Sequence, residues 1–114
     1  MDQARLIHPG IMDDDKWIRM PFEMQMGNIG AEIARLTHWK RKGNQKNMDA
    51  CWERALELID LTVYGISKSD KPYRMKELLI LRKLLCDFAG DFGEYGVDGE
   101  ALADYCTEFM LMKK

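Results

Sequence analysis

The side chains of this sequence that could do chemistry are few, and they form no recognisable catalytic set. His38 stands beside Trp39, and its unperturbed pKa near neutrality would suit a general base or a pH switch. No carboxylate or hydroxyl partner for His38 can be identified. We therefore expect a partly exposed histidine near a helix end, and we predict no catalytic residue and no enzyme.

Acidic residues and cysteines can bind metals, but here neither has the required spacing. Residues 13–15 are three consecutive aspartates, whose side chains do not converge on one ion without other partners. A calcium loop beginning at Asp91, within the acidic and glycine-rich segment 90–100, would need Glu at its twelfth position, where Leu102 stands. The three cysteines are widely spaced, without a Cys-x-x-Cys pair: Cys51, Cys86 and Cys106. We expect reduced, mostly buried thiols, and no metal or cofactor.

A basic segment offers a different chemistry, the binding of nucleic acid. Lysine and arginine neutralise phosphates, and a tryptophan among them can stack on a base. The candidate contacts are Arg35, Trp39, Lys40, Arg41, Lys42 and Lys46. Glu32, Glu53 and Glu57 lie close by in sequence, and the helix dipole by itself favours basic residues at a C-terminal end. Nucleic-acid binding is therefore an alternative function, and nucleic acid is not the expected partner.

The composition is that of an ordinary globular domain. The chain has 114 residues, about one domain, of which 46% are hydrophobic and 32% charged. Its formal net charge of −2 gives no global field that would attract nucleic acid or an anionic membrane. No run of about 20 apolar residues is present, and residues 1–9 lack the apolar centre of a signal peptide. We expect a cytoplasmic protein with no membrane partner.

Apolar residues recur at steps of three and four in four segments, at about 22–42, 47–64, 71–89 and 99–112. This spacing marks one buried face of a helix. Short connections separate the segments, and helices joined in this way usually lie antiparallel. The sequence therefore predicts an all-α fold, an up-down antiparallel bundle of about four helices.

Residues outside the apolar pattern indicate where the domain and its helices begin. Residues 1–20 contain a His-Pro-Gly turn signal and are expected to form an irregular N-terminal arm, before a single helical domain over 21–114. Asn44 and Asn47 are both candidate N-caps of the second helix. Gly27 and Gly30 lie inside the first helix, in a stripe of small residues with Ala31 and Ala34, and each interior glycine lowers stability by about 1 kcal/mol relative to alanine. We expect the backbone of another helix to approach this stripe closely.

The third segment has the most apolar composition. Its apolar residues face nearly all sides of the helix, which predicts that this helix is the central one: Leu78, Leu79, Ile80, Leu81, Leu84, Leu85 and Phe88. Trp52 and Leu81 lie on the most apolar faces of their helices and are predicted core residues.

The sequence has more apolar side chains than the core of four short helices can bury. Positions 109–112 place apolar side chains over about 300° of the last helix. Methionines near the start of the first helix add adaptable apolar surface. Large exposed patches are unusual on monomers, so we expect a symmetric homodimer. The predicted interface residues are Met24, Met26, Phe109, Met110, Leu111 and Met112.

The hairpin between the first two helices resembles a single tetratricopeptide repeat, which implies two antiparallel helices. The residues that carry the resemblance are Trp39, Gly43, Trp52, Ala55 and Leu56. Two positions depart from the pattern, because Leu36 replaces the usual first-helix glycine and Asp60 the usual closing proline. No second copy is present, although such arrays need about three repeats for stability.

The strings NIGAEIARLTHWKRKGNQ, residues 28–45, and ERALELIDLT, residues 53–62, resemble a family of short all-helical prokaryotic proteins. The resemblance implies a helical middle third and carries over no functional residue. The leading expectation is therefore a non-enzymatic protein-interaction module or a small homo-oligomeric bundle. The alternatives are a nucleic-acid-binding accessory protein that uses the basic end of the first helix, and a small enzyme without a recognisable motif.

Overall fold

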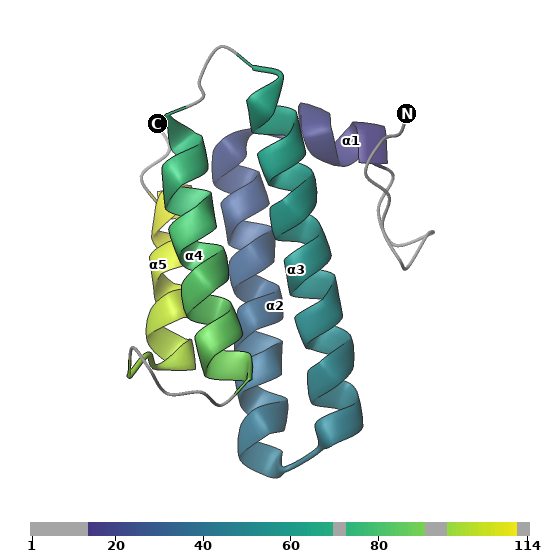
Figure 1. Ribbon diagram of the computed structural model, residues 1–114, viewed down its shortest axis with the longest axis vertical. Coiled ribbons are helices and arrows are strands. Elements are labelled where there is room, and N and C mark those ends of the chain that lie inside the picture. Colours follow the sequence, from purple (N-terminus) through teal and green to yellow (C-terminus); the bar gives the residue numbers. More distant parts are fainter. Residues whose placement is uncertain (1–13, 70–72, 91–95, 112–114) are drawn as a thin grey trace.

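The computed structural model describes residues 14–69, 73–90 and 96–111, which form helices and, within these ranges, no strand (Figure 1). The helices are α1 (Asp14–Arg19), α2 (Phe22–Lys42), α3 (Gln45–Ser67), α4 (Arg74–Ala89) and α5 (Gly99–Leu111). The predicted all-α fold is confirmed. Residues 71, 72 and 112, which the sequence assigned to helices, lie outside the described residues.

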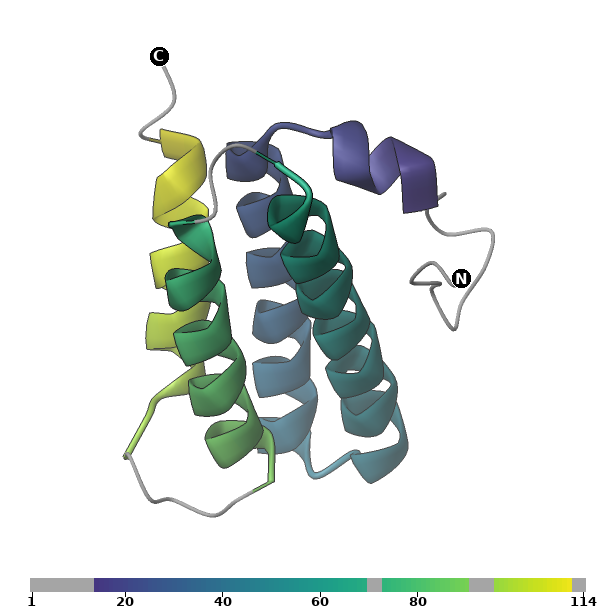
Figure 2. The same cartoon turned by 45° about the horizontal axis from the view of Figure 1, so that its top comes forward.

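Helices α2 to α5 run alternately down and up, as Figures 1 and 2 show. The predicted up-down arrangement is therefore confirmed. Helix α2 packs against both α3 and α5, and these are the most extensive contacts between helices. Helix α4 packs against α3 and less extensively against α5. The central helix is thus α2, and the prediction of a central place for the third segment, which forms α4, is wrong.

Helix α1 belongs to the folded domain, which corrects the assignment of residues 1–20 to an irregular arm. Trp17 is fully buried, and its indole Nε1 donates a hydrogen bond to Thr62 Oγ1 at 2.8 Å. The Gln25 side-chain amide donates to the Trp17 carbonyl at 2.8 Å. A six-residue helix is too short for apolar periodicity to reveal, so the sequence pattern missed it. Residues 1–13 lie outside the described residues.

The turn between α2 and α3 follows from two adjacent residues. Gly43 ends α2 in the left-handed region, with φ of 71°, and its N–H donates to the Lys40 carbonyl. Asn44 then caps α3, because its side-chain oxygen accepts a hydrogen bond from the Asn47 N–H at 3.0 Å. Of the two predicted N-caps, Asn44 is therefore the one in use.

The core is a stripe along the inner faces of α2, α3 and α4, closed by α5 and by Trp17. Leu81 is buried as predicted, whereas Trp52 lies half-buried at the edge of the core. Met26 is fully buried, so its prediction as an interface residue is wrong. Met26 lies three residues before Ile29 on the inward stripe of α2, which explains its burial.

Helix α5 lies close to the backbone of α2 at Gly30, one of the two interior glycines for which the sequence predicted such a contact. A Cβ atom at Gly30 would lie 2.9 Å from Cys106 Cβ and 3.1 Å from the Ala103 carbonyl oxygen. Any side chain at Gly30 would therefore push α5 away from α2.

We expect Gly30→Ala to lower the free energy of unfolding by about 1 to 3 kcal/mol, because overpacking outweighs the better helix propensity of alanine. Gly65→Ala is the matched control. A Cβ there meets only Ile18 Cγ2 at 3.4 Å, an ordinary contact, so this variant should be neutral or more stable. Urea unfolding measures both, and equal effects would contradict the close contact of α2 and α5.

Candidate functional site

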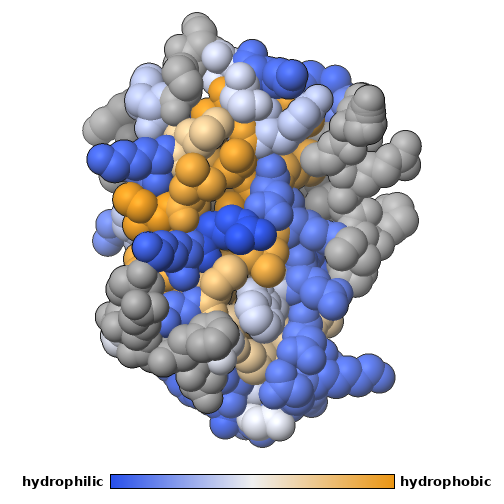
Figure 3. Space-filling model, in the orientation of Figure 1, coloured by the Kyte–Doolittle hydropathy of each residue, from blue (hydrophilic) through white to orange (hydrophobic). Residues whose placement is uncertain are grey.

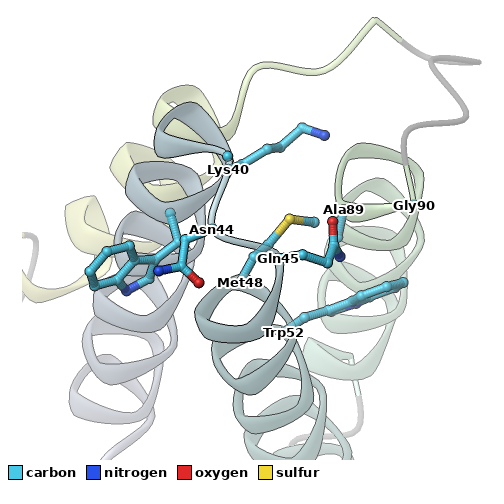
Figure 4. A pocket seen from close by; sticks show the side chains of 9 residues that line it. Lys40, Asn44, Gln45, Met48, Trp52, Ala89 and Gly90 are labelled. Atoms are coloured by element: carbon cyan, nitrogen blue, oxygen red, sulfur yellow. The ribbon is translucent and has the colours of Figure 1, made fainter.

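A cavity of about 380 Å³ opens where the α2–α3 turn meets the end of α4 (Figure 4). Lys40 extends from α2 across its upper side, Met48 points into it from α3, and Trp52 reaches from α3 toward the end of α4. Two of the six predicted nucleic-acid contacts, Trp39 and Lys40, therefore line this cavity together with Trp52, the predicted core tryptophan.

The lining of this cavity can bind but offers no catalytic set. The Nε1 atom of Trp52 is buried without a hydrogen-bond partner in the described part of the chain. Lys40 Nζ lies 5.3 Å from the centre of the Phe88 ring, a cation–π distance. Gln45 and Asn44 already use their side chains, in a hydrogen bond to Asp49 and in the cap of α3. The lining residues include no cysteine, serine, histidine or carboxylate.

The predicted nucleic-acid contacts do not form one free basic patch. Arg35 Nη1 lies 2.8 Å from Glu32 Oε2, and Arg41 pairs with Glu100 at the start of α5. Two of the five basic candidates thus face carboxylates. The other candidates surround the α2–α3 turn: Trp39, Lys40, Lys42 and Lys46.

His38 is exposed on α2, as predicted, and lines a cavity of about 280 Å³ together with Glu100 and Asp104. Its ring packs edge-on against Trp39, with ring centres 4.8 Å apart. Within residues 14–69, 73–90 and 96–111, no group of three or more His, Cys, Asp or Glu side chains could hold a metal ion. The acidic segment 91–95 lies outside the described residues.

Glu32 carries a buried charge between α2 and α3. Its side chain is nearly inaccessible, with Arg35 Nη1 at 2.8 Å and Arg54 Nη1 at 3.4 Å from its oxygens. A second pair, Arg82 Nε with Asp60 Oδ1 at 2.7 Å, joins α4 to α3 at the surface. Both pairs stabilise contacts between helices, and the sequence analysis identified neither.

The three cysteines are free thiols, as predicted. Burial raises the pKa of the Cys106 thiol to about 12. Burial, and then the charge of Glu32, raise the pKa of Cys51. Protonated thiols are poor nucleophiles and poor metal ligands, so neither residue suits catalysis or metal binding.

The largest accessible apolar side chains gather on α4 and its border with α5. Leu79 and Ile80, in the middle of α4, are 49% and 48% exposed, and Tyr105 on α5 is 39% exposed. Figure 3 shows this apolar surface in front, crossed by hydrophilic residues. The sequence analysis missed it, because it placed the third helix at the centre of the bundle.

The predicted interface residues whose side chains the structure describes, Met24, Met26 and Phe109, do not gather on one face. Phe109 is half-buried and packs edge-on against Phe22, with ring centres 5.5 Å apart. Met24 is exposed, but it lies two residues from Phe22, about 200° around α2, and so points away from Phe109. Met112 and the side chains of Met110 and Leu111 lie outside the described structure.

We expect Glu32→Ala to lower the free energy of unfolding by about 3 kcal/mol, since it leaves Arg54 without its buried counter-charge. Asp60→Ala is the control, because it breaks an exposed ion pair worth about 1 kcal/mol or less. Urea unfolding of both variants measures the difference. Equal losses would mean that Glu32 is not a buried charge.

We expect Cys106 to make stability fall between about pH 9 and pH 12. The folded thiol keeps its proton up to a pKa of about 12, whereas the unfolded thiol loses it near the ordinary value of 9.0, so rising pH favours unfolding. Thermal melts of the native chain and of Cys106→Ala should therefore converge over this range. Cys86→Ala, at a half-buried position, should remain parallel to the native chain, and a parallel Cys106→Ala curve would contradict the effect.

None of the described helices is long and apolar enough to cross a membrane. No family model, curated protein or solved structure matches the chain. Its function must therefore be inferred from its own surface and charges.

Proposed function

We propose that the protein is a non-enzymatic helical interaction module that works as a homodimer in the cytoplasm. The observation that carries the proposal is the apolar outer surface of α4, where Leu79 and Ile80 are each about half exposed. The three free cysteines agree with a reducing compartment.

Packing within one bundle leaves about half of the Leu79 and Ile80 side chains exposed. Leu78, Leu81 and Leu85 form the inward stripe of α4 and are buried. A surface helix normally carries polar residues opposite such a stripe. Full burial of such a side chain contributes about 1.5 to 3 kcal/mol, so burying the exposed half of Leu79 and of Ile80 against a partner would contribute about 1 kcal/mol each. A second copy of the chain is the simplest partner, because one new contact then covers the apolar surface of both copies.

The surroundings of α4 also favour protein binding. Tyr73 is 68% exposed at the start of α4, and Arg74 lies over the Phe22 ring at 4.4 Å. Tyrosine and arginine are the residue types enriched at protein interfaces. The pairing of Arg35 and Arg41 with carboxylates weighs against nucleic-acid binding. The resemblance of the α2–α3 hairpin to a tetratricopeptide repeat stays a prediction that agrees with an interaction role.

We expect the native chain to sediment as a dimer at micromolar concentration, and Ile80→Lys to raise the dimer dissociation constant at least tenfold. Each dimer loses the burial of two half-exposed isoleucine side chains, at about 1 kcal/mol each. Met24→Lys, at an exposed position of α2, is the control and should remain dimeric. Sedimentation equilibrium measures all three, with circular dichroism to verify folding. A native chain that is monomeric throughout would refute the proposal.

A further inference from the structure

We draw no further inference here: the strongest candidate, the cavity of about 380 Å³ beside the α2–α3 turn, carries none, because its Lys40 already lies over the Phe88 ring and the buried Nε1 of Trp52 by itself does not show which class of ligand the cavity would hold.

Discussion

The close packing of α2 against α5 is the contact on which the rest of this structure depends. It is possible because Gly30 has no side chain where Cys106 and the Ala103 carbonyl press against α2. With α5 on one side and α3 on the other, α2 becomes the central helix, and its stripe from Phe22 to Leu36 is buried. Helix α4 packs against α3 and α5 at the periphery of the bundle. Its position at the periphery, more than its composition, leaves apolar residues in contact with solvent.

The same packing brings several charged residues into ion pairs within the bundle. Glu32 is buried between α2 and α3, where arginines offset the cost of desolvating its charge. Arg41 reaches Glu100 on α5, and Arg82 reaches Asp60 on α3. The Arg41–Glu100 pair joins helices that are distant in sequence, and the Arg82–Asp60 pair joins two consecutive helices. Lys76 and Glu108 are exposed on the outer sides of α4 and α5.

Protein binding accounts for these features more economically than catalysis does. Burial raises the pKa of the Cys51 and Cys106 thiols, and His38 is exposed beside Trp39, in a cavity that Glu100 and Asp104 also line. The cavity beside the α2–α3 turn has a buried indole N–H and a lysine, which can donate hydrogen bonds to a ligand. The outer surface of α4, in contrast, needs only a complementary surface.

The sequence by itself determined the helices, because periodicity and capping are local. The apolar steps of α2 and the cap at Asn44 could be recognised without knowing any neighbour. Helix α1 could not, since a six-residue helix shows little periodicity and Trp17 is held by the distant Thr62. Only the tertiary structure decided which apolar faces are buried. Met26 and Ile80 both lie in apolar stretches, but the first faces the core and the second faces solvent, because burial depends on which helices pack together.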